Sequence, residues 1–105
     1  MSFEKLLYPR SIAVVGASAA SEKVGYAILN NIVRDGFDGA IYPINPKEKE
    51  ILGQQCYASI LDIPEELDCV VISVKRDIVL SVLHDCKKKK AGAVIIVTAG
   101  FSETG

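Results

Sequence analysis

Apolar residues in this chain fall into short continuous runs that alternate with stretches of helical periodicity. Runs that are apolar at successive positions are typical of strands buried on both faces, as in a parallel sheet. Between them, apolar side chains recur three and four positions apart over residues 24–35 and 77–91, which predicts two helices. Four runs have the length of a strand: residues 11–16, 40–44, 68–74 and 93–97.

The alternation of strands and helices predicts the fold class. Consecutive parallel strands need a crossover, and a helix laid across one face of the sheet supplies it with right-handed chirality. We therefore expect an α/β fold with a doubly wound parallel sheet, three layers, and a single domain spanning residues 1–105. Because such folds normally continue with another helix after a strand like 93–97, the polar tail indicates a module truncated at its C-terminus.

Individual residues predict where several of the helices and strands begin or end. Ser21 is expected to be the N-cap of the first helix, and Gly36 its C-terminal stop. Pro43 fits a strand end better than a central ladder position. In the segment that follows, residues 54–58 are expected to form a brief edge strand, and residues 59–62 match a capping box.

Size and charge exclude several classes of function. A chain of 105 residues, half of them hydrophobic, suits one small core. The net charge of −1 gives no long-range positive field for nucleic acid or an anionic membrane, so any phosphate binding must be local. The lysine run 87–90 is expected to end the second helix, opposing its dipole, and not to form a ligand patch. With neither a secretory signal nor a spanning segment of ~20 apolar residues, a cytoplasmic location is expected.

Several residue types that often carry chemistry are expected to be structural here. Cys56, Cys69 and Cys86 have no C-x-x-C spacing and are interpreted as buried hydrophobes. His84 lies opposite the apolar stripe of its helix, so it is expected to face solvent. No Ser/His/Asp set, buried carboxylate pair or metal cluster can be assembled, so neither catalytic residues nor a metal site are predicted.

The most informative polar and small residues follow the predicted strands. In an open α/β sheet, ligands bind beyond the carboxyl ends of the strands, near the point where strand order reverses. Three segments are expected to converge there: residues 16–25, 43–47 and 73–75.

The first of these segments has the composition of a phosphate-binding loop. Gly16 allows a tight turn, Ala17 and Ser18 permit close approach of the backbone, and the following helix offers free N–H groups. The spacing is not G-x-G-x-x-G, because the next glycine is Gly25. An ordinary connection between a strand and a helix is the alternative interpretation.

The second segment lacks the acidic residue with which an NAD-binding domain accepts hydrogen bonds from ribose. The strand runs out through Pro43 and Asn45 to Lys47, which offers a cation to a phosphate attached to ribose. Coenzyme A and NADP carry such a phosphate, whereas NAD does not. A lysine that is merely solvated is the alternative.

Taken together, these motifs resemble the CoA-binding domain of the NDP-forming acyl-CoA synthetases, relatives of the succinyl-CoA synthetase alpha subunit. The resemblance covers nearly the whole chain, and it lies in residues 9–18, 23–25, 41–47, 71–74 and 98–101. It implies a Rossmann-like domain whose ligand is coenzyme A or acyl-CoA, with other domains or subunits of the ligase completing the site of acyl transfer. The catalytic histidine of these enzymes belongs to a later domain, so the chain alone is expected to bind without turnover.

The resemblance also assigns residues to parts of the ligand. Glu103 follows the last motif and is interpreted either as an approach to the reactive end of the ligand or as a solvated tail residue. Lys75 is included in the site although the family often has proline there. The other assigned residues are Gly16, Ala17, Ser18, Lys23, Val24 and Gly25 in the nucleotide loop, Pro43, Asn45 and Lys47 at the adenosine end, and Ser73 and Val74 along the pantetheine path.

Two further functions stay open alongside the acid-CoA ligase. The same kind of CoA-binding domain can serve a protein acyltransferase, in which it is joined to a separate acetyltransferase domain. The third possibility, from a different class, is a domain that senses NADP(H)-type nucleotides and has no catalytic role.

Overall fold

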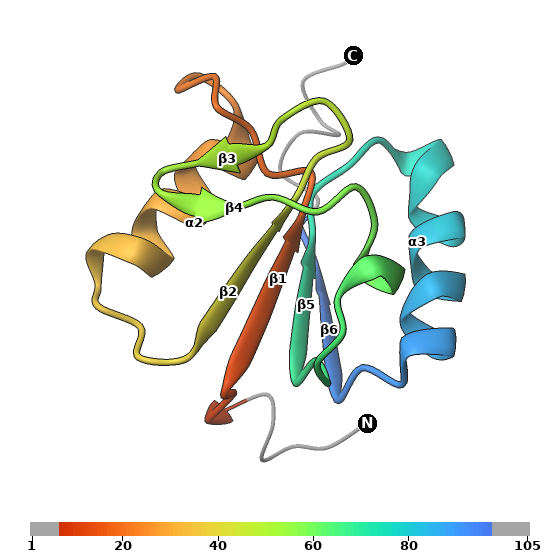
Figure 1. Ribbon diagram of the computed structural model, residues 1–105. Coiled ribbons are helices and arrows are strands. Elements are labelled where there is room, and N and C mark those ends of the chain that lie inside the picture. Colours follow the sequence, from red (N-terminus) through yellow and green to blue (C-terminus); the bar gives the residue numbers. More distant parts are fainter. Residues whose placement is uncertain (1–6, 98–105) are drawn as a thin grey trace.

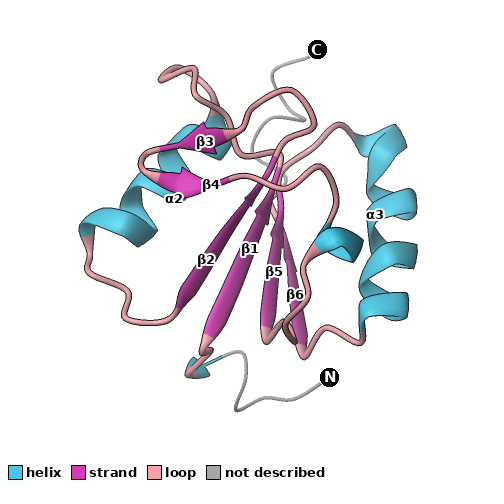
Figure 2. Ribbon diagram, viewed as in Figure 1, coloured by secondary structure: helices cyan, strands magenta, loops and turns pink. Residues whose placement is uncertain are grey.

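The computed structural model describes residues 7–97, and at its centre lies a sheet of four parallel strands (Figures 1 and 2). The predicted α/β parallel sheet is confirmed, and the observed strands lie within the predicted apolar runs. Strand order reverses beside β1, because the chain moves from β1 outward to β2 and then returns to the other side of β1. Across the sheet the order is β2 (Ala40–Ile44), β1 (Ser11–Val15), β5 (Cys69–Ile72) and β6 (Ala93–Ile96).

Helices cover the two faces of this sheet, which gives the three predicted layers (Figure 1). On one face α2 (Val24–Arg34) packs Leu29 against Val14, and both side chains are fully buried. On the other face α3 (Arg76–Lys89) packs Val82 against a larger cluster that includes Ile72. Residues of the central strands β1 and β5 that alternate between the faces therefore meet apolar partners on both sides, as their continuous apolar runs require, whereas Ile95 and Ile96 of the edge strand β6 stay partly exposed.

The connection from β2 to β5 contains no α-helix. It forms a small antiparallel hairpin of β3 (Glu50–Ile51) and β4 (Gln54–Gln55), then a single turn of 3-10 helix, η1 (Ile60–Asp62). The edge strand expected at residues 54–58 is thus correct only for its first two residues, because Tyr57 instead forms an isolated bridge to the strand end at Ile44. Ser59 caps η1, its hydroxyl accepting a hydrogen bond from the Leu61 N–H at 3.1 Å, but no longer helix follows the predicted capping box.

The ends of the two α-helices test the predicted boundaries. Ser21 is not the N-cap of α2: the N–H of Lys23 bonds the Ala20 carbonyl in a turn, so the helix starts two residues later, with Lys23 at the cap. Gly36 ends α2 as predicted, with a φ of +75° and its N–H bonded to the Val33 carbonyl. The predicted position of the lysine run at the end of α3 is confirmed, and Lys90 terminates the helix in the left-handed conformation.

Candidate functional site

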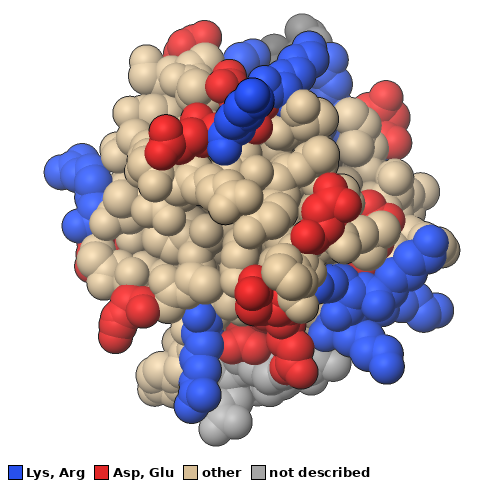
Figure 3. Space-filling model, viewed as in Figure 1, with Lys and Arg blue, Asp and Glu red and all other residues tan. Residues whose placement is uncertain are grey.

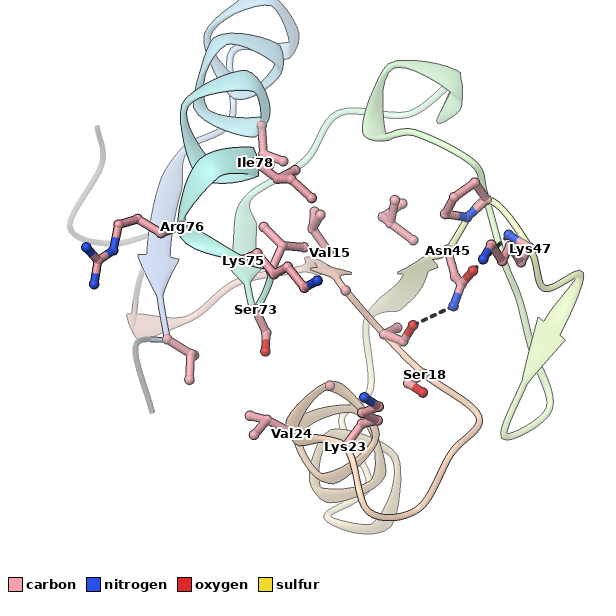
Figure 4. Close-up of a pocket in the computed structure, with 18 of the residues that line it drawn as sticks. Val15, Ser18, Lys23, Val24, Asn45, Lys47, Ser73, Lys75, Arg76 and Ile78 are labelled. Carbon is pink, nitrogen blue, oxygen red and sulfur yellow. Dashed lines mark hydrogen bonds between the residues drawn. The ribbon is translucent and has the colours of Figure 1, made fainter. Parts of the chain in front are cut away.

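A cleft of about 1290 Å³ opens at the carboxyl ends of the strands, above the point where strand order reverses (Figure 4). All of the residues predicted to form the site line this cleft except Pro43, which is fully buried in β2. The Pro43 carbonyl accepts a hydrogen bond from the Tyr57 N–H at 2.9 Å, so the segment that follows β4 pairs with β2 at this residue. The predicted residues that do meet at the cleft are Gly16, Ala17, Ser18, Lys23, Val24, Gly25, Asn45, Lys47, Ser73, Val74 and Lys75.

Two glycines make the loop between β1 and α2 compact. Gly16 has a φ of +91°, and a Cβ there would lie 2.1 Å from the Ser73 carbonyl oxygen. A Cβ on Gly25 would lie only 1.9 Å from the Gly16 carbonyl oxygen. The second glycine thus lets the first turn of α2 rest directly on the loop, which explains the unusual spacing by packing. It brings the N-terminal end of the helix to the wall of the cleft.

Ser18 stabilises the same loop with a hydrogen bond from within it. Its hydroxyl oxygen accepts a hydrogen bond from the Ala20 N–H at 3.0 Å. A hydroxyl that accepts in this way keeps its own hydrogen for donation. Ser18 can therefore donate to an anionic group in the cleft while it holds the turn in shape.

Asn45 ties the tip of β2 to the glycine loop. Its side-chain amide nitrogen donates to the Ala17 carbonyl at 2.9 Å, and its amide oxygen accepts from the Lys47 N–H at 2.8 Å. Both halves of the amide are engaged, so Lys47 is held on the same rim as the glycine loop (Figure 4). An aspartate at this position would have no hydrogen to donate and would place a carboxylate against a carbonyl oxygen.

Positive charge predominates around the cleft. Lys23, Lys47 and Lys75 line it, and Asp77 is the one carboxylate among the described lining residues. Arg76 also lines the cleft, but in the close-up its side chain points outward, whereas Lys75 extends toward the middle of the cleft (Figure 4). Lysine and arginine side chains also gather at the top of the molecule, over the carboxyl ends of the strands, and separately beside the end of α3 (Figure 3).

From the sequence, only Val74 was identified in the apolar wall of the cleft, and its neighbours Ile78 and Ala58 were missed. Ile78, in the first turn of α3, is 45% exposed and lines the cleft beside Val74. The signal for Ile78 was present, since it is the first apolar residue of the helical stripe that follows β5. Ala58 gave no local signal, because the bridge between Tyr57 and Ile44 carries it to the cleft from a distant part of the chain.

The titratable side chains that sequence reasoning set aside are away from the cleft. Cys56, Cys69 and Cys86 are free and buried as predicted, and burial raises the pKa of each thiol, that of Cys86 to about 11. Neutral thiols are poor nucleophiles. His84 is exposed on α3, also as predicted. Glu103 and the motif at residues 98–101 lie outside the described residues.

Residues 7–97 contain neither a grouping of metal-ligating side chains nor a membrane-spanning helix. Within residues 7–97, no three His, Cys, Asp or Glu side chains are grouped so that they could hold a metal ion. Neither is any helix in that range long and apolar enough to cross a bilayer.

Comparison with known proteins relates this geometry to a family. A family profile described as CoA binding domain matches residues 10–104. An ADP-forming acetate–CoA ligase of Methanocaldococcus jannaschii is 50% identical over 98 residues, which cover 93% of this chain and 14% of that protein. The alpha subunit of ADP-forming acetate–CoA ligase I of Pyrococcus furiosus is 46% identical over 109 residues, covering 100% of this chain and 24% of that subunit.

Solved structures give the same result. The dinucleotide-forming acetyl-coenzyme A synthetase 1 of Ca. Korarchaeum cryptofilum, in complex with phosphate and ADP, matches with a TM-score of 0.90 and 44% identity. The match covers 99% of this chain and 22% of that one. The chain thus spans less than a quarter of the length of each of these three relatives.

Proposed function

This chain belongs to the CoA-binding domain family, and from that premise we propose that its cleft binds coenzyme A on behalf of an NDP-forming acid–CoA ligase. The observation that carries the proposal is the hydrogen bond from Asn45 to the Ala17 carbonyl. It joins a loop of small residues at a helix N-terminus to a loop that bears a lysine, so that one cleft offers both backbone donors and a cation. A phosphorylated adenosine needs both.

The adenosine end of coenzyme A is assigned to the β1 and β2 side of the cleft. Backbone N–H groups at the start of α2, together with the Ser18 hydroxyl, suit the oxygens of a diphosphate. Lys47 is exposed on the neighbouring rim and suits the 3′-phosphate on ribose. Position 45 is an asparagine where an NAD-binding domain has an acidic residue, and this favours a ribose that carries a phosphate over the unmodified ribose of NAD.

The pantetheine arm is assigned to the apolar wall on the other side. This arm carries no charge, and burying its methylene and methyl groups against Val74 and Ile78 removes apolar surface from water at about 25 cal/mol per Å². Ser73, half-buried at the end of β5, supplies a polar group for an amide of the arm. The ligand thus runs from the tip of β2 across β1 toward α3.

The reaction itself is assigned to parts outside this chain. The relatives named above are ligases several times longer, and the resemblance implies that acid, ATP and coenzyme A are interconverted with acyl-CoA, nucleoside diphosphate and phosphate. Such a reaction needs a group that carries phosphate. The cleft holds no histidine among its described lining residues, so we expect binding of coenzyme A without turnover.

Isothermal titration calorimetry with coenzyme A and 3′-dephospho-CoA tests the proposal. We expect the wild-type chain to bind both, and coenzyme A more tightly. Removing an exposed cation from a phosphate costs about 1–1.4 kcal/mol, so Lys47→Ala should weaken coenzyme A about five- to tenfold. Lys88→Ala, at the far end of α3, is the matched control and should bind as the wild type does. Failure of the wild type to bind either ligand would refute the proposed function.

Competition with NADPH addresses the nucleotide-sensing alternative, because NADPH also carries a phosphate on ribose. We expect excess NADPH to leave bound coenzyme A in place. Displacement at comparable concentrations would favour the NADP(H)-type domain instead. Whether the parent protein is a ligase or a protein acyltransferase is tested by assaying the full-length protein for acyl-CoA formation that depends on nucleoside triphosphate.

A further inference from the structure

Lys75 occupies a distinctive place in the cleft. It is the N-cap residue of α3, held in extended backbone geometry, and its side chain makes no capping hydrogen bond. The side chain is exposed and extends toward the middle of the cleft (Figure 4). It enters from the β5 side, whereas Lys23 enters from the α2 side and Lys47 from the β2 side (Figure 4). The three ammonium groups therefore approach the cleft from three different segments.

The strand order indicates which part of the ligand each lysine meets. Since β1 lies between β2 and β5, and adjacent strands are about 4.8 Å apart, the tips of β2 and β5 are separated by roughly 10 Å. Coenzyme A presents its charges in a fixed order: the 3′-phosphate on ribose, then the diphosphate, then the uncharged pantetheine arm. If Lys47 meets the 3′-phosphate at β2, the next charged group toward β5 is the diphosphate.

Resting on the proposed function, we propose that Lys75 binds the diphosphate of coenzyme A from the β5 side, opposite Lys23. The pantetheine arm has no charge that would call for a cation, and the 3′-phosphate is assigned to Lys47 two strands away. A diphosphate carries two negative charges, which two lysines on opposite walls of the cleft complement. Lys75 is thus a specificity-determining residue for the diphosphate, distinct from the contact to the 3′-phosphate.

Ligand analogues separate these two contacts by calorimetry. Lys75→Met removes the charge and keeps most of the apolar stem. We expect it to weaken coenzyme A and 3′-dephospho-CoA by the same factor, about five- to tenfold, since both carry the diphosphate. Lys47→Ala should weaken coenzyme A alone. Lys88→Ala removes the same charge at the far end of α3, from a side chain that does not line the cleft, and should weaken either ligand less than twofold.

Several results would overturn this inference while leaving the proposed function standing. Unchanged binding by Lys75→Met and by Lys75→Gln would show that the lysine makes no contact. A loss that vanishes with 3′-dephospho-CoA would assign Lys75 to the 3′-phosphate. An equal loss in Lys88→Ala would indicate a general effect of the protein's charge and no specific contact. In contrast, wild-type protein that binds neither ligand would refute the proposed function itself, so the two failures are distinguishable.

Discussion

Replacing Gly25 by alanine perturbs the contact on which the shape of the cleft depends. The new Cβ would lie 1.9 Å from the Gly16 carbonyl oxygen and 2.8 Å from the Gly16 carbonyl carbon. Both atoms belong to the backbone and cannot rotate away as a side chain can. The first turn of α2 and the glycine loop must therefore separate by roughly 1 Å before the methyl group fits, a scale at which overpacking is costly.

The expected cost follows from that displacement. Overpacking a close contact typically destabilises a protein by about 1–3 kcal/mol, and a clash between two backbone segments belongs at the upper end of that range. For a domain of this size, each kcal/mol lowers the melting temperature by about 4–8 °C, so Gly25→Ala should melt roughly 12–24 °C below the wild type. A domain with a stability of about 5–15 kcal/mol stays folded at 25 °C despite this loss.

Thermal unfolding followed by circular dichroism measures the stability, and calorimetry at 25 °C measures affinity for coenzyme A. We expect affinity to fall at least tenfold, because the displaced loop is the assigned phosphate site. Gly36→Ala is the matched control: Gly36 has a φ of +75° but no atom within 4 Å of an added Cβ. It should cost only about 1 kcal/mol of conformational strain and leave binding unchanged. If Gly25→Ala melted no lower than Gly36→Ala, the reasoning from close backbone contact would be wrong.

Two further substitutions test the rim and the opposite end of the sheet. Asn45→Asp replaces the donor to the Ala17 carbonyl by an acceptor. It should destabilise the fold by about 1–3 kcal/mol and weaken the binding of coenzyme A in the same titration. Unaltered binding would contradict the role of the bond. Burial first, and then the hydrogen bond to Glu65, raise the pKa of Tyr42 to about 12 from its ordinary 10. The folded state therefore favours the neutral phenol, and the stability this gives is complete below pH 10 and is lost as pH rises toward 12. In urea unfolding from pH 8 to pH 11, the advantage of the wild type over Tyr42→Phe should shrink, whereas a constant difference would refute the shift.

Much of the fold was predictable because the central strands of the sheet are buried on both faces. Residues 69–72 are buried and apolar at every position, and the short length of the run favours a strand over a buried helix. The convergence of the site residues was predictable for a related reason, since parallel strands bring their carboxyl ends to one edge. What the pattern could not reveal is contact between segments far apart in the chain.

Pro43 illustrates the limit. Its place beside Asn45 and Lys47 suggested a role at the ligand, yet Pro43 is fully buried, and the Tyr57 N–H bonds its carbonyl. In the hairpin, β3 was missed and only the first two residues of the strand expected at 54–58 were right, because both strands are two residues long and mostly polar, so no periodicity marks them. Ser21 had the right chemistry for an N-cap, but a turn delayed the start of the helix.

The bond between Asn45 and the Ala17 carbonyl has a consequence for how a ligand is captured. The bond joins the two loops through protein atoms alone, so their relative position does not have to be selected when coenzyme A arrives. A preorganised pair of loops loses little conformational entropy on binding, and more of the contact energy then appears as affinity. This end of the cleft is therefore expected to be preorganised, and its backbone should be nearly superimposable before and after the ligand binds.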